Sequence, residues 1–238
     1  MPRFPRFTFL RSTRCCLLLA STALAPSHAA PAAAPADGIA LAVVFDTSGS
    51  MRASLATKPG SGADAKYLIA QRAFGTVIDR LDAFTKSPSA KPLSVGVYIF
   101  RGNDAVVALP LAPFHAARLK QWLAAMHPDG STPLGDAIFL AARDLLATNA
   151  ASRHILVLTD GANTVGRTPE AALEKVTAAA LAKQTPVFTH IIALDIAPKV
   201  FAALQKQGAT LIGAADESQL NAQFDFILEE KILVEAPR

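Results

Sequence analysis

Cysteine is almost missing from this sequence of 238 residues. Cys15 and Cys16 are its only two cysteines, and both lie near the N-terminus. The rest of the chain can therefore cross an oxidising compartment without forming disulfides. Long apolar runs are missing as well, because no apolar run long enough to span a bilayer follows Ala29. We therefore expect no membrane insertion of the main body of the chain.

An excess of charge of one sign is also missing. The formal net charge is +4, from 23 basic and 19 acidic residues. Four of the basic residues lie within residues 1–29, so 19 basic and 19 acidic residues remain beyond them. A neutral body argues against nucleic acid or an anionic membrane as a partner. The 51% hydrophobic and 18% charged residues exclude a disordered or collagen-like chain and favour a well-filled core.

The N-terminal segment, residues 1–29, has the three parts of a secretory signal. Arginines at positions 3, 6, 11 and 14 precede the apolar stretch Cys15–Ala25, and small residues around Ala29 suit a signal peptidase. A helix of that length rises only ~16 Å, too little to span a bilayer. We predict a signal peptide over residues 1–29, with an uncleaved signal anchor as the alternative. Lipidation is disfavoured because both cysteines precede the rest of the apolar run.

After a Pro/Ala linker over residues 30–38, apolar runs alternate with helical patterns. Residues 39–45 are continuously apolar, as expected of a strand buried on both faces. Further strands are predicted over 93–100, 105–109, 154–158, 187–194 and 209–212, and helices over 64–84, 115–126, 132–146, from 169, over 199–207 and from 216. This order predicts an α/β fold with a doubly wound, mostly parallel central sheet and helices on both faces. One domain, residues 39–235, accounts for the pattern.

Two helices carry particular local signals. The helix over 64–84 is expected to turn one apolar stripe inward, formed by Leu68, Phe74, Val77, Ile78, Leu81 and Phe84. The last helix is expected to begin at Asp216, because Gln219 follows three residues later as in a capping box.

Oxygen-bearing side chains gather in three predicted loops. Asp46-Thr47-Ser48-Gly49-Ser50 follows the first strand, residues 129–136 precede a helix, and Thr159-Asp160-Gly161 follows a central strand. Binding sites of open parallel sheets form beyond the carboxyl ends of the strands. We therefore expect the three loops to contribute to one site.

These three motifs, in this order, resemble the von Willebrand factor type A (VWA) family. The resemblance implies that the loops form a metal ion-dependent adhesion site. By position, Ser48 and Ser50 would coordinate the ion through their hydroxyls and Thr132 directly or through water. Asp46 and Asp160 would act mainly through bridging waters. The chain departs from the pattern in one place, an insertion over residues 52–62, which is expected to reshape the rim of the site.

Hydroxyl and carboxylate oxygens with retained waters suit a small hard cation, so Mg²⁺ is the expected ion, with Mn²⁺ or Ca²⁺ as alternatives. The expected function is that of a non-catalytic adhesion or complex-assembly module, periplasmic or secreted. A bound ion with few direct protein charges can accept a carboxylate from a protein partner. The fold is expected to form without the ion.

A metal-dependent hydrolase is the alternative function. Hydrolysis needs a titratable base beside the metal-bound water, and His127 is the only candidate. His190, inside a predicted strand, is expected to be a buried, hydrogen-bonded core residue. A phosphatase with an Asp-x-Asp motif is disfavoured because Ser48 occupies the second position, and no phosphate-binding loop is found.

Overall fold

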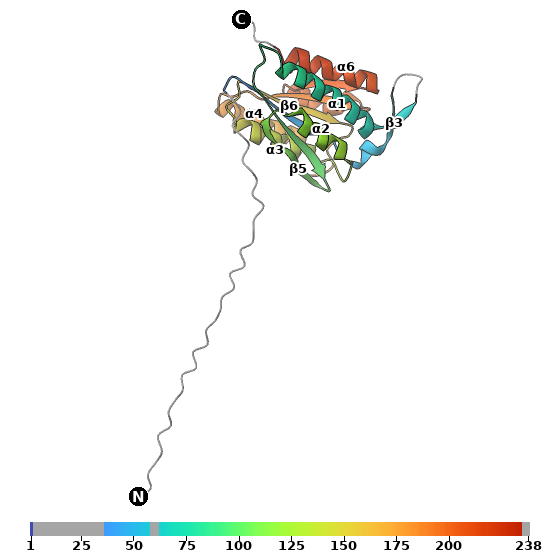
Figure 1. The fold of residues 1–238 in the computed structure, drawn as a ribbon. Helices are drawn as coiled ribbons and strands as arrows, with labels where there is room; N and C mark the ends of the chain where they lie inside the picture. The colour runs from blue at the N-terminus through green and yellow to red at the C-terminus, as the bar shows by residue number, and fades with distance from the viewer. Residues whose placement is uncertain (2–35, 58–61, 235–238) are drawn as a thin grey trace.

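A six-stranded sheet forms the centre of the computed structural model (Figure 1). The structure describes residue 1, residues 36–57 and residues 62–234. The strand order is β5-β4-β1-β6-β7-β8. All neighbouring strands are parallel except β4 and β5, which form an antiparallel hairpin at one edge. The strands are β1 (Ile39–Phe45), β4 (Leu93–Arg101), β5 (Asp104–Pro113), β6 (Ser152–Thr159), β7 (Phe188–Leu194) and β8 (Thr210–Ala214). The mostly parallel sheet predicted from the alternation is confirmed.

Helices cover both faces of the sheet, as Figure 1 shows. One layer contains α1 (Lys66–Thr85), α2 (Ala116–Ala125) and α6 (Glu217–Ile227), and the other contains α3 (Leu134–Leu146), α4 (Pro169–Ala182) and α5 (Ala202–Lys206). Short helical turns occur at Gly49–Arg52, Pro198–Phe201 and Leu228–Ile232. Alternate residues of β1 divide between the layers, with Val43 in one core and Val44 in the other. Among the described residues, no helix has both the length and the apolarity needed to cross a membrane.

Most element boundaries agree with the sequence prediction to within two or three residues, but two details differ. Strand β5 extends to Pro113, four residues beyond the predicted end, because it pairs along β4 as far as Ser94. In α1 the side chain of Ile69 is fully buried while Leu68 is only partly buried, so the predicted stripe was wrong by one position there. The signal peptide over 1–29 and residues 30–35 of the linker lie outside the described residues.

The insertion over residues 52–62 forms part of a small hairpin. Strand β2 (Ser54–Ala56) pairs with β3 (Ala63–Ala65), and α1 begins at the next residue, Lys66. The hairpin projects beside the end of α1 (Figure 1). Sequence analysis placed an insertion here and did not predict these strands.

The carboxyl ends of β1, β4 and β6 are level with one another. Phe45, the last residue of β1, is in register with Ile99 of β4 and Leu158 of β6. The Asp46 backbone N–H donates a 2.9 Å hydrogen bond to the Leu158 carbonyl. The loops that follow β1 and β6 therefore leave the sheet side by side.

Candidate metal centre

Side chains from the loops after β1 and β6 join in one hydrogen-bonded row. The Ser48 and Ser50 hydroxyls are 3.0 Å apart, and the Ser50 hydroxyl donates a 2.6 Å hydrogen bond to Asp160 Oδ1. Ser50 and Asp160 are 110 residues apart in sequence. Ser48 and Asp160, at the two ends of the row, are buried, whereas Ser50 between them is exposed, so the row meets solvent at Ser50. The predicted convergence of these loops is present in the structure.

The Asp46 carboxylate lies beneath this row and is fully buried. It accepts hydrogen bonds from the Ser48 N–H at 2.8 Å and from the Thr159 hydroxyl at 2.6 Å. Burial raises the pKa of Asp46 to about 6; these hydrogen bonds lower it, and the charge of Asp160 adds to the rise. Within the described residues no cation forms an ion pair with Asp46. Asp46 is thus a buried carboxylate with no counter-ion among the residues that the structure describes.

Thr132 comes from the loop before α3, and two hydrogen bonds to Thr164 hold its backbone in place. The Thr132 N–H donates to the Thr164 hydroxyl at 2.8 Å, and the Thr164 N–H donates to the Thr132 carbonyl at 3.0 Å. A methyl group at Gly161 would lie 3.8 Å from Ser50 Oγ and 3.9 Å from Thr132 Oγ1. The third predicted loop therefore reaches the same site, with Gly161 between the two hydroxyls.

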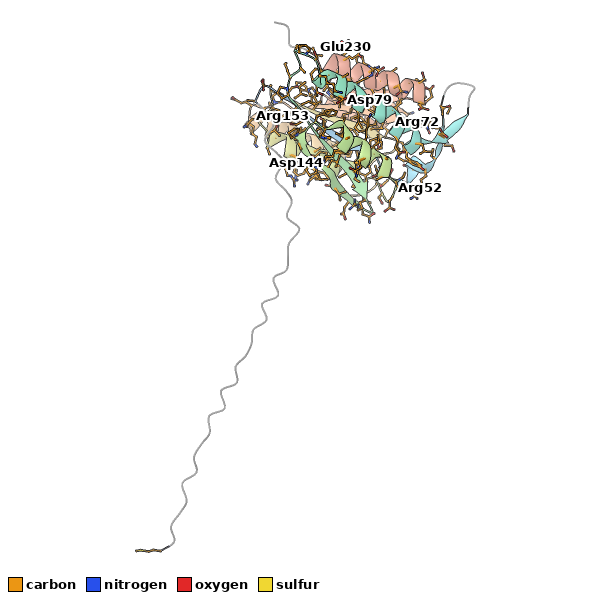
Figure 2. All side chains as sticks on the ribbon, viewed as in Figure 1. Arg52, Arg72, Asp79, Asp144, Arg153 and Glu230 are labelled. Atoms are coloured by element: carbon orange, nitrogen blue, oxygen red, sulfur yellow. The ribbon has the colours of Figure 1, made fainter. Side chains whose placement is uncertain are left out.

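The loop before Thr132 is bonded to the loop after β1. The Gly49 N–H donates to the Gly130 carbonyl at 3.0 Å, and the Asp129 N–H donates to the Thr47 carbonyl. The Arg52 guanidinium donates to the Pro128 carbonyl; Figure 2 shows Arg52 at the end of the molecule that carries the β2–β3 hairpin. These bonds join the two loops without using the hydroxyls of Ser48, Ser50 or Thr132.

The donor set fits a small divalent cation. Three hydroxyls and two carboxylates, all oxygen donors, are the ligands that Mg²⁺ and Mn²⁺ accept, and such ions keep several waters. A cation would also offset the cost of burying the Asp46 charge. No group of three or more His, Cys, Asp or Glu side chains suited to a metal occurs in the described part of the chain. A site here would therefore depend on hydroxyl ligands.

Comparison with known families agrees with the fold. The model of the von Willebrand factor type A domain matches residues 40–222. The chain belongs to this family. The sequence matches no curated protein.

Three solved structures share the VWA fold at low sequence identity. The PilB minor pilin from Streptococcus sanguinis is 16% identical with a TM-score of 0.61, over 80% of this chain and 60% of the pilin. The vWF domain of the type V pili tip protein Mfa5 from Porphyromonas gingivalis is 13% identical with a TM-score of 0.61, over 85% and 98%. Proximal thread matrix protein 1 from the mussel byssus, with a zinc-occupied MIDAS motif, is 16% identical with a TM-score of 0.56, over 81% and 47%. The chain thus spans less than two thirds of the pilin and of the byssus protein.

The candidate metal centre also contains a positively charged side chain, that of Lys66, which sequence analysis missed. Lys66 Nζ lies 3.0 Å from Asp160 Oδ2 and 2.9 Å from Asp195 Oδ2, and the lysine side chain is only 8% exposed. Burial by itself would lower the pKa of Lys66, but the two carboxylates raise it overall. Asp160 is 94 residues away in sequence, so no local pattern could have revealed the pair.

The two histidines considered from the sequence lie outside this VWA site. His127 is exposed and borders a hollow of about 450 Å³ that Trp122 also lines. It makes no hydrogen bond to a predicted ligand among the described residues. His190 is buried, with its Nε2 3.1 Å from His154 Nδ1, which confirms the expectation of a hydrogen-bonded core residue. Neither histidine is placed to serve chemistry at Ser48.

Proposed function

We propose that this VWA protein is an exported, metal-dependent protein-binding module that captures a carboxylate of its partner through a divalent cation. The convergence of Ser48, Ser50 and Asp160 with Thr132 and Asp46 is the observation that supports it. These are the positions at which the family resemblance implies metal ligands.

Each of these residues has a separate task in the proposed site. Ser48, Ser50 and Thr132 would hold Mg²⁺ or Mn²⁺ through their hydroxyls, and Asp46 and Asp160 would hold its waters. The bound ion supplies an electrophilic centre that accepts a carboxylate oxygen. Asp46 also orients the loop after β1 through the Ser48 N–H, and Thr159 holds Asp46 in turn. Because the ion has few direct charged ligands, it keeps its attraction for an anionic partner.

Export rests on the segment over residues 1–29, for which we propose a cleaved signal peptide followed by a linker to residue 38 and a domain over 39–235. The mature protein would then be periplasmic or secreted. The pilin and pilus tip neighbours support a role in adhesion or assembly. The zinc-occupied motif of the byssus protein supports a divalent ion at this site.

We propose a binding role in preference to hydrolysis. A hydrolase would need a base beside a metal-bound water. Within the described part of the chain, His127 makes no hydrogen bond to the predicted ligands, and Asp46 is fully buried with both oxygens already bonded. We therefore assign no catalytic residue.

Thermal unfolding with increasing Mg²⁺ tests the metal site. A ligand at a hundredfold excess over its Kd stabilises the folded state by about 2.7 kcal/mol, so a saturating concentration should raise Tm by several degrees. Thr132→Ala should lose most of this rise while the metal-free Tm changes little. Thr76→Ala, on the exposed face of α1, is the matched control and should keep the full rise. A wild-type Tm that does not move up to ~10 mM Mg²⁺ would argue strongly against the site.

Capture from an exported-fraction extract tests the binding role. Wild-type protein should retain a specific partner in Mg²⁺ and release it in EDTA. Thr132→Ala should fail to retain the same partner even in Mg²⁺. Retention that persists in EDTA would rule out capture through the ion.

A further inference from the structure

A buried ammonium group lies against one of the proposed metal carboxylates. Both oxygens of Asp160 are engaged: Oδ1 accepts from Ser50 at 2.6 Å, and Oδ2 faces Lys66 Nζ at 3.0 Å. Asp160 itself is buried, so solvent screens this ion pair poorly. An incoming divalent ion therefore meets a carboxylate that already has a positive partner.

The helix that carries Lys66 does not favour a positive charge at this position. It is the first residue of α1, where the helix dipole disfavours a cation, and the first turn contains no acidic residue. Its second partner, Asp195, has φ +53°, a left-handed conformation that is uncommon for a residue with a side chain. Apolar residues often replace a buried ion pair without loss of stability. These features together point to a role in the site rather than in the core.

The inserted hairpin fixes Lys66 in this place. The Lys66 N–H donates to the Ala53 carbonyl at 2.9 Å, and strand β3 ends immediately before it. Asp64 of the hairpin pairs with Arg72 of α1 at 2.9 Å, which ties the hairpin to the helix further along. Figure 2 shows Arg52 and Arg72 at this end of the molecule. The insertion over residues 52–62 thus positions the buried ammonium group of Lys66.

We propose that Lys66 is a built-in counter-charge that lowers the affinity of the free protein for its divalent ion and makes ion and carboxylate binding depend on each other. The inference rests on the proposed function. Asp46 and Asp160 supply two negative charges, and Lys66 offsets one of them. A divalent ion then leaves a positive centre, which a partner's carboxylate neutralises. Asp195, whose side chain is 45% exposed, compensates Lys66 less effectively because water screens it.

Titration of the purified protein with Mn²⁺ alone, followed by calorimetry, tests this role. Lys66→Met should lower the Kd for Mn²⁺ by about tenfold or more, because a like charge a few ångströms away is removed. Lys66→Arg keeps the charge and should stay within about threefold of wild type on the same Coulomb argument. Lys120→Met is the matched control, since Lys120 pairs with Asp79 on the surface, and its Kd should equal that of wild type.

A second variant keeps the proposal testable if Lys66→Met fails to fold. Asp195→Asn retains Lys66 and removes its exposed partner, so the Kd for Mn²⁺ should rise severalfold. If Lys66→Met folds and its Kd for Mn²⁺ is unchanged or raised, the role of Lys66 is overturned and the metal site still stands. If Lys66→Met does not fold, an unchanged Kd in Asp195→Asn has the same meaning. Absence of Mn²⁺ binding in both wild type and Lys66→Met overturns the metal site and this inference together.

Discussion

Asp46 combines a stability cost with a proposed metal-binding role in a single residue. Its carboxylate is fully buried, and burial raises its pKa from 3.8 to about 6. At neutral pH the buried, ionised carboxylate therefore lowers the free energy of unfolding by about 3 kcal/mol, since one pKa unit corresponds to 1.36 kcal/mol. A nearby divalent ion would remove much of this cost. Stability of the metal-free protein and affinity for metal thus oppose each other at Asp46.

Asp46→Asn should separate these two effects. In EDTA at pH 7.5 the variant should unfold at a Tm several degrees above wild type, because the buried charge is gone. In Mg²⁺ it should show little further rise. Scanning fluorimetry of both proteins in both buffers measures this, with the exposed Asp104→Asn as the control that should follow wild type. A lower Tm for Asp46→Asn in EDTA would contradict the account.

The pairing of Asp160 with Lys66 changes one expectation for mutagenesis. From its loop position, Asp160→Ala would be expected to weaken metal binding and spare the fold. In the structure this change leaves a buried ammonium with one half-exposed partner. We therefore expect Asp160→Ala also to lower the metal-free Tm, an effect that Thr132→Ala should not show.

At the scale of elements, two helical glycines differ in how closely other atoms pack against them. A Cβ at Gly135, in the first turn of α3, would lie 2.1 Å from the Arg167 carbonyl oxygen. The same loop before α4 carries Thr164, which clamps Thr132. A Cβ at Gly75, in the middle of α1, would meet nothing within 4 Å. Close packing of α3 against this loop therefore supports the position of Thr132 in the proposed metal site, whereas Gly75 has no contact that would give it such a role.

Alanine at each position should reveal the difference. Gly135→Ala should lower the free energy of unfolding by about 2 kcal/mol or more, because backbone must move, and should weaken Mg²⁺ binding as Thr132 shifts. Gly75→Ala should raise it by about 0.5–1 kcal/mol through helix propensity and leave Mg²⁺ binding unchanged. Urea unfolding and Mg²⁺ titration of both variants check the pair. Equal effects of the two changes would contradict the packing argument.

At the scale of the whole molecule, a buried histidine pair sits toward the amino ends of β6 and β7, away from the metal centre. Burial lowers the pKa of His154 to about 3 and of His190 to about 4; each is lowered further by a neighbour, His190 and Lys231 respectively. Both rings are neutral in the folded chain and become charged on unfolding below pH 6.5. The unfolded state then binds more protons, so stability falls as pH decreases from about 6.5 to about 4.

His154→Gln should flatten this dependence. From these pKa values the pair lowers the free energy of unfolding by on the order of 6 kcal/mol between pH 7 and pH 4, and replacing one member should remove a large part of this loss. Urea unfolding at pH values across this range measures the slope. His115→Gln, at an exposed position, is the control and should leave the slope unchanged. A His154→Gln slope equal to that of wild type would show that the pair does not control acid stability.

Local patterns in the sequence were sufficient to predict most of the elements. The final helix begins where Asp216 and Gln219 predicted it: Asp216 Oδ1 accepts from the Gln219 N–H at 2.8 Å, and Gln219 Oε1 accepts from the Ala215 N–H at 3.0 Å. Capping and apolar periodicity depend on residues close together in the chain, so both can be recognised directly in the sequence. The same holds for the three ligand loops, because each follows or precedes a recognisable element.

Tertiary structure alone decided how the site is charged. The pairing of Lys66 with Asp160 and Asp195 joins three distant segments, and the inserted hairpin that positions Lys66 was not predicted from its composition. The sequence determined the alternating α/β order, which depends on local spacing, and the three motifs whose resemblance to the VWA family implied the five candidate ligands. Whether a lysine at a helix start faces solvent or a buried carboxylate depends on which strand ends meet at the edge of the sheet, and only the packed fold establishes that.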